Sequence, residues 1–140
     1  MHINRDLNEK QMAKKEVKKN YLILYLSICV VCLFFVICRW INTINPSLTI
    51  LPEIIDIHVT NFSLSLMLSI FTGFTVLISG GKMKIIRIIS IIIVFINLVY
   101  EVFVPILNTP DFVDALAGII GVVISYLYLS RLNRNGLIDI

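Results

Sequence analysis

Charged residues are scarce in this chain of 140 residues. Asp, Glu, Lys and Arg make up 15% of it, against ~25% in a typical soluble domain. Hydrophobic residues make up 58%, and the mean hydropathy is +0.92. A soluble fold of this size would lack the polar surface to cover its core, so lipid must solvate most of the surface. The length is enough for one domain and leaves no room for a second.

Histidine and cysteine are too few to indicate a metal or nucleophilic site. Cys29 and Cys32 form a C-x-x-C, but apolar residues flank both, which disfavours a thiolate. No second cysteine pair and no neighbouring histidine completes a metal set. His58 is the only histidine beyond the N-terminal segment. We therefore expect cysteines that pack in a membrane helix, no metal, no cofactor and no enzymatic activity. A basic stretch interleaved with aromatics is also missing, which argues against a nucleic-acid partner.

Four long apolar runs predict four transmembrane helices, and hence an all-α polytopic bundle in the lipid bilayer. Each run holds about 20 residues, the number that crosses ~30 Å of hydrocarbon. The predicted spans are residues 21–41, 58–79, 85–107 and 112–132. Pro46, Pro52 and Gly80-Gly81 break the chain between runs, and glycine is typical just after a helix C-terminus.

The four spans predict three parts: a basic segment 1–20, a transmembrane domain 21–132 and a short tail 133–140. A cleaved signal peptide would have an apolar core of ~7–15 residues followed by small residues. The first run is longer and continues into Arg39-Trp40, so we interpret it as a retained span.

The distribution of lysine and arginine predicts the orientation. Eleven of the 12 basic residues lie on one side: before the first span, in or next to the connection between the second and third, or at the end of the fourth and after it. Only Arg39 lies at the opposite side. Short cytoplasmic loops are rich in Lys and Arg. Both termini are therefore expected in the cytoplasm, with the chain in the bacterial cytoplasmic (inner) membrane. Acidic residues gather at the predicted outer side: Glu53, Asp56, Glu101, Asp111 and Asp114.

Polar residues within the spans fall on shared helix faces. In the fourth span, Asp114 is followed by small residues at offsets of 4, 7 and 11, which share one face at ~100° per residue. These small residues are predicted to serve helix packing, and they are Gly118, Gly121 and Ser125. Polar stripes on the second, third and fourth spans predict three helices facing one another around an outer-facing pocket. Its predicted lining residues are Glu101, Asp114, Asp111, His58, Asn61 and Asn97.

Several of these residues have simpler interpretations. Asp111 would equally serve as the N-cap of the fourth helix, since Asp is a favoured N-cap. His58 is more typical of a boundary residue than of a ligand. Glu101 and Asp114 differ, because a carboxylate inside a span usually has a partner or a function. If the two share one pocket, a shared proton or a bound cation becomes plausible.

The residues from Glu101 to Ser125 resemble the signature of VanZ-like membrane proteins. That family has a Glu near the outer end of its third span, then an Asp-x-x-Asp that opens the fourth. Small or amide residues follow at +4, +7 and +11. Glu101, Asp111 and Asp114 occupy the acidic positions of this pattern. The family has Gln where this chain has Val104, and Arg within the loop 107–109, so a divergent member is predicted.

The resemblance implies a non-enzymatic protein of the cell envelope, linked to reduced susceptibility to teicoplanin-type glycopeptide antibiotics. Its outer acidic pocket is then expected to engage a lipid-linked or amphipathic ligand. The alternative is a small cation- or proton-coupled transporter, for which a homo-oligomer is expected. A transporter needs a polar path to the cytoplasmic side, and only hydroxyl-bearing residues such as Ser69, Thr72 and Ser90 offer one.

Overall fold

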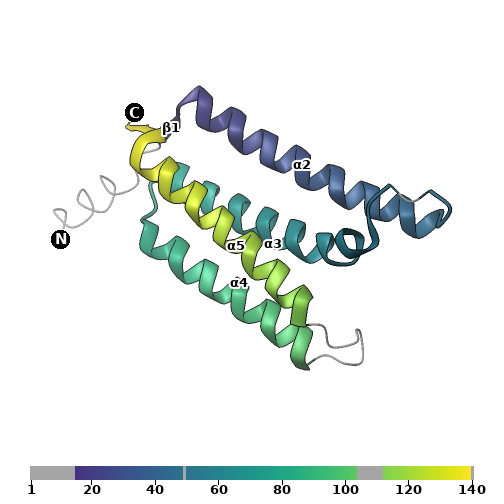
Figure 1. The fold of residues 1–140 in the computed structure, drawn as a ribbon. Coiled ribbons are helices and arrows are strands. Elements are labelled where there is room, and N and C mark those ends of the chain that lie inside the picture. The colour runs from purple at the N-terminus through teal and green to yellow at the C-terminus, as the bar shows by residue number, and fades with distance from the viewer. Residues whose placement is uncertain (1–14, 49, 104–111, 140) are drawn as a thin grey trace.

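The computed structural model describes residues 15–48, 50–103 and 112–139. Four long helices run along one another (Figure 1). They are α2 (Lys19–Ile44), α3 (Glu53–Ile78), α4 (Met83–Phe103) and α5 (Phe112–Arg131). All four are long and apolar enough to cross a membrane, which confirms the predicted four-helix, multi-pass architecture at that level. The outward-facing side chains are largely apolar and exposed, as expected of a surface in contact with lipid.

Helix α3 begins at Glu53, five residues before the predicted start of this membrane span at residue 58. The backbone amides of Ile55 and Asp56 donate to the carbonyl of Pro52, which closes the first turn. Glu53 and Asp56 lie in that turn, where the positive end of the helix dipole favours acidic groups. These charges lower the local hydropathy and conceal the helix start in the sequence. As a result, His58 lies in the second turn of α3.

The C-terminus of α3 is closed by the two glycines, as predicted. Gly80 has a φ of 78°, a left-handed conformation that glycine adopts without steric cost. Its amide donates to the carbonyl of Leu77 at 3.0 Å, and the amide of Gly81 donates to that of Val76 at 2.8 Å. This pair of hydrogen bonds is the Schellman arrangement, which satisfies carbonyls left open at the helix end.

Helix α3 is the centre of the bundle. It packs most extensively on α5 and also contacts α2 and α4. Large apolar side chains fill the part of the interface nearest the chain ends, and the fully buried ones are Ile70, Leu77, Ile86, Leu129 and Leu132. Helix α2 is the least buried of the four. It is held by a stack of Tyr25 on Phe74, with ring centroids 4.2 Å apart, and by the Tyr128 hydroxyl, which donates to the Tyr21 carbonyl at 2.8 Å.

The segment before the first helix pairs with the segment after the last one, which the sequence did not predict. Strand β1 (Lys15–Val17) lies antiparallel to β2 (Leu137–Asp139), with Val17 opposite Leu137. A π-helical turn, η2 (Leu132–Gly136), leads from α5 into β2. The amide of Lys18 also donates to the carbonyl of Gly136 at 2.9 Å. Residues 15–17 and 137–139, which were predicted to belong to separate parts of the chain, therefore meet at the end of the bundle where α3 turns into α4 (Figure 1).

Charge is segregated between the two ends of the bundle. The end with the β1–β2 pair, here the basic end, carries most of the basic side chains of the described residues: Lys15, Lys18, Lys19, Lys82, Lys84, Arg87, Arg131 and Arg134. At the opposite, acidic end, α3 begins and α4 approaches its C-terminus. The acidic side chains described there are Glu53, Asp56, Glu101 and Asp114.

Candidate polar site at the acidic end

Six polar side chains from three helices meet at the acidic end of the bundle, and we call them the polar cluster. Within α3 they are spaced by three and four residues, so they share one face, and the two in α4 are four residues apart. The cluster consists of His58, Asn61 and Ser65 on α3, Asn97 and Glu101 on α4, and Asp114 on α5.

The contacts of the cluster form three levels along the bundle. The level nearest the helix ends is a His–Asp pair. Nδ1 of His58 lies 2.7 Å from Oδ1 of Asp114, which joins α3 to α5. The two side chains keep 20% and 12% of their surface exposed. When the imidazole is protonated, this contact is an ion pair. Otherwise it is a hydrogen bond donated by the ring N–H to the carboxylate. The pair is therefore partly accessible.

The second level is a carboxamide–carboxylate contact. Nδ2 of Asn61 donates to Oε1 of Glu101 at 2.8 Å and joins α3 to α4. Glu101 is only 4% exposed. A carboxyl group buried this far is costly without hydrogen-bond donors, so Asn61 compensates part of its desolvation.

The third level lies deepest in the bundle. The hydroxyl of Ser65 donates to Oδ1 of Asn97 at 3.2 Å, and Nδ2 of Asn97 donates to the Ser65 oxygen at 2.9 Å. Gly118 of α5 lies directly against this pair. A Cβ at that position would sit 2.9 Å from Asn97 Nδ2 and 3.0 Å from Ser65 Oγ. The absence of a side chain at Gly118 thus leaves room for the Ser65–Asn97 pair.

The structure brings together five of the six side chains predicted to line the pocket, and the sixth, Asp111, lies outside the described residues. Glu101 and Asp114 each bind a different partner on α3. Glu101 is only 4% exposed, and the expectation that it lines an open, wet pocket stays a prediction. The His58–Asp114 level is partly exposed.

The packing residues on α5 lie against α3. A Cβ on Gly121 would be 2.5 Å from the carbonyl oxygen of Phe62, so the backbones of α3 and α5 approach closely there. Ser125 is fully buried, and its hydroxyl has no hydrogen-bond partner in the described part of the chain. Thr72, from the polar stripe of α3, donates to the carbonyl of Leu68 in its own helix at 2.7 Å.

An apolar groove adjoins the accessible level of the cluster. Its volume is about 290 Å³, and it lies between α2, α3 and α5. His58 contributes to its wall together with apolar side chains, which are Phe35, Ile55, Val59, Phe62, Ala117 and Ile120. An apolar groove next to a His–Asp pair is suited to a molecule with both an apolar and a polar part.

A second set of polar contacts at this end was missed in the sequence. Arg39 of α2 donates from Nη1 to the carbonyls of Asp56 and Ile57 on α3. Nδ2 of Asn42 donates to Oδ1 of Asp56 at 2.9 Å, and the amide of Ile50 donates to Oδ1 of Asn42 at 3.1 Å. The available signal was Arg39 itself, the one basic residue on the acidic side. These contacts tie α2 to the start of α3.

Among residues 15–48, 50–103 and 112–139, no three His, Cys, Asp or Glu side chains converge so as to hold a metal ion. In comparisons with known proteins, no family model, no curated protein and no solved structure matches the chain. Fold and site together define a helical protein with four helices suited to a membrane and a polar cluster at one end. The resemblance to VanZ-like proteins stays a prediction.

Proposed function

We propose that the chain is a VanZ-like, non-enzymatic protein of the bacterial cytoplasmic membrane that binds a lipid-linked or amphipathic molecule at its acidic end. This binding lowers the susceptibility of the cell to teicoplanin-type glycopeptides. The observation that carries the proposal is the His58–Asp114 pair, partly exposed and bordered by the apolar groove. The proposal places both termini in the cytoplasm and the acidic end on the outside.

The chemistry of the site favours an amphipathic ligand. The groove offers apolar walls to a hydrocarbon or aromatic part of the ligand. The partly exposed carboxylate of Asp114 and the imidazole of His58 offer acceptors and donors to its polar part. Beneath them, Asn61 and Glu101 hold α3 and α4 in place. The cluster therefore combines an accessible polar contact with a rigid support.

Binding is better supported than transport. Below the Ser65–Asn97 pair, the interior towards the basic end contains Ile70, Leu77 and Leu129, each with no exposed surface. A bare cation or proton needs polar groups or water along its path, and desolvating a charge in an apolar layer is costly. The buried hydroxyls of Ser69 and Ser125 interrupt this layer only locally. If cation flux into proteoliposomes depended on Glu101, transport would be better supported than binding.

Antibiotic susceptibility tests the proposal. A bacterial host carrying the wild-type chain is expected to withstand more teicoplanin than a host with an empty vector. The Glu101→Gln/Asp114→Asn variant is expected to return the host to the empty-vector level, because it removes both carboxylates of the cluster. Glu53→Gln is the matched control, since Glu53 is an exposed acid of the same end outside the cluster. Membrane levels must be equal in all strains. If all strains were equally susceptible to teicoplanin, the activity of VanZ-like proteins could not be assigned to this chain.

Thiol labelling tests the orientation. The three native cysteines, all free, are replaced by alanine, and single cysteines are introduced at Ser47 or Lys82. Ser47 follows α2 at the acidic end, and Lys82 precedes α4 at the basic end. In intact cells, a membrane-impermeant maleimide is expected to label Ser47→Cys alone, because loops rich in Lys and Arg face the cytoplasm. Labelling of Lys82→Cys alone would show the reverse orientation.

A further inference from the structure

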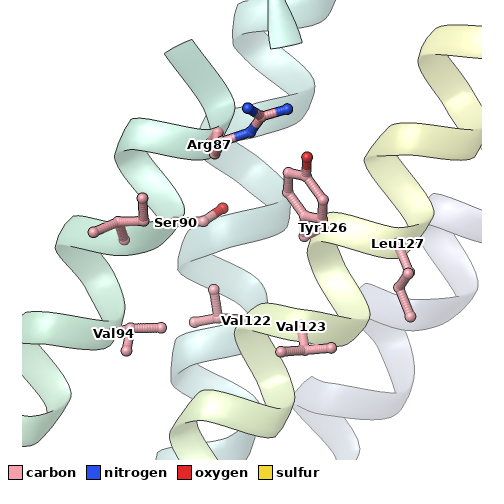
Figure 2. A pocket seen from close by; sticks show the side chains of 8 residues that line it. Arg87, Ser90, Val94, Val122, Val123, Tyr126 and Leu127 are labelled. Carbon is pink, nitrogen blue, oxygen red and sulfur yellow. The ribbon is translucent and has the colours of Figure 1, made fainter. Parts of the chain in front are cut away.

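A second groove lies at the other end of the bundle, on the lipid-facing side between α4 and α5. Its volume is about 290 Å³. Figure 2 shows its wall, to which α4 contributes Arg87, Ser90 and Val94, and α5 contributes Val123, Tyr126 and Leu127. Since a water-sized group occupies ~30 Å³, this volume corresponds to about ten methylene-sized groups. It is therefore of the right order for part of an acyl chain.

The polar groups of the groove are ordered along its length. The guanidinium of Arg87 and the hydroxyl of Tyr126 lie together at one end, whereas Val94, Val123 and Leu127 lie further down (Figure 2). Arg87 is one turn after the start of α4 and therefore close to the basic end of the bundle. Arginine and tyrosine at such a depth keep their polar tips at the membrane–water boundary and their apolar parts in the hydrocarbon.

Ser90 contributes to the wall of the groove below Arg87. The residue is 8% exposed, and its hydroxyl has no hydrogen-bond partner among the described residues. It lies one turn below Arg87, and Figure 2 shows its oxygen directed into the space between α4 and α5. Its oxygen has almost no accessible surface, so the wall of the groove at Ser90 is apolar and suits a hydrocarbon chain.

We propose that this groove, defined by Arg87 and Tyr126 at its mouth, Ser90 below them and Val94 and Val123 beyond, binds one chain of an anionic glycerophospholipid. The phosphate lies at Arg87 and Tyr126. The acyl chain follows the valines. This order of phosphate and chain matches the order of the charged and apolar side chains along the groove. The proposal does not depend on the function of the polar cluster, which lies at the opposite end.

Charge favours a lipid over a second copy of this chain. Arg87 is exposed, and no acidic side chain in the described ranges forms an ion pair with it. A second copy inserted in the same direction would bring its own basic end, with Lys82, Lys84 and Arg131, to the same depth. Like charges at that depth would repel each other. A phosphate supplies the opposite charge, and the interaction of one Lys or Arg with an anionic membrane surface contributes ~1 kcal/mol.

Lipid titration followed by native mass spectrometry tests the proposal. The purified full-length chain is delipidated in detergent and titrated with phosphatidylglycerol or with phosphatidylcholine of the same acyl chains. The wild type is expected to prefer phosphatidylglycerol about fivefold, which corresponds to ~1 kcal/mol. Arg87→Gln should abolish this preference and leave weak binding of both lipids. Val123→Trp should reduce the binding of both, because an indole fills the half-exposed wall position.

Arg131→Gln is the matched control, since Arg131 is an exposed arginine of the same end that does not line the groove. It should retain the preference. If Arg87→Gln and Arg131→Gln weakened the preference for phosphatidylglycerol equally, general surface charge would explain that preference. This result would overturn the proposal. Unchanged lipid binding in Val123→Trp, or a dimer that Val123→Trp dissociates, would also overturn it. Elution volume and circular dichroism report folding. If Val123→Trp misfolds, the comparison of the two exposed arginines decides alone.

Discussion

Gly121→Ala is expected to destabilise the bundle by about 1–3 kcal/mol, the usual cost of adding volume to a close-packed interface. The added Cβ would lie 2.5 Å from the carbonyl oxygen of Phe62, and 3.1 Å from the amide nitrogen of Leu66. Both atoms belong to the backbone of α3, so relief requires the two helices to move apart. Thermal unfolding in detergent micelles, followed by circular dichroism, measures the effect.

Gly73→Ala is the matched control for this prediction. It is the same change in the partner helix α3, but the added Cβ would meet only the side chain of Leu129. A side-chain tip can rotate away more cheaply than a backbone can shift, so a smaller loss is expected. Both variants share the gain in helix propensity of alanine over glycine, which therefore cancels in the comparison. Equal stabilities of Gly121→Ala and Gly73→Ala would contradict the close approach of α3 and α5.

Removing Asn61 is expected to produce the largest loss among the polar residues of the cluster. Asn61→Ala takes a hydrogen-bond donor from Glu101, which is 4% exposed. Hydrogen bonds to charged groups contribute about 1.5–3 kcal/mol. We therefore expect Asn61→Ala to lower the free energy of unfolding by about 2–3 kcal/mol, measured by the same thermal unfolding.

A double-mutant cycle isolates the interaction. In a Glu101→Ala background, Asn61→Ala should cost less, and the coupling energy should be about 1–2 kcal/mol. Thr75→Val is the control, because the Thr75 hydroxyl donates to the carbonyl of Phe71 in its own helix and joins no second helix. It should change stability by less than about 0.5 kcal/mol. Additive effects of Asn61→Ala and Glu101→Ala would show that the two side chains do not interact.

Several features were readable from the sequence because they depend on local chemistry. Four runs of apolar residues predict four helices of membrane-spanning length, since the bilayer requires about 20 residues per span. The end of α3 at Gly80 follows from the left-handed conformation that glycine favours there. The residues of the cluster could be proposed because helical periodicity brings side chains three and four positions apart to one face.

The partners of these residues could not be derived from periodicity. Helical spacing places Asn61 and His58 on one face of α3, but it does not say that one binds Glu101 and the other Asp114. That choice depends on the rotation of each helix about its axis and on its offset along the bundle. The close approach at Gly121 contributes to both, because it brings the backbone of α5 against that of α3.

The sequence by itself determined the class of structure, four helices suited to a membrane with basic and acidic residues at opposite ends, because length, apolarity and charge are properties of each segment alone. Only the tertiary structure decided the rest. The pairing of β1 with β2 joins residues from the two chain ends. The burial of Glu101 and the groove beside Arg87 arise where separate helices meet. These features depend on contacts between distant segments, which side-chain periodicity within one segment does not encode.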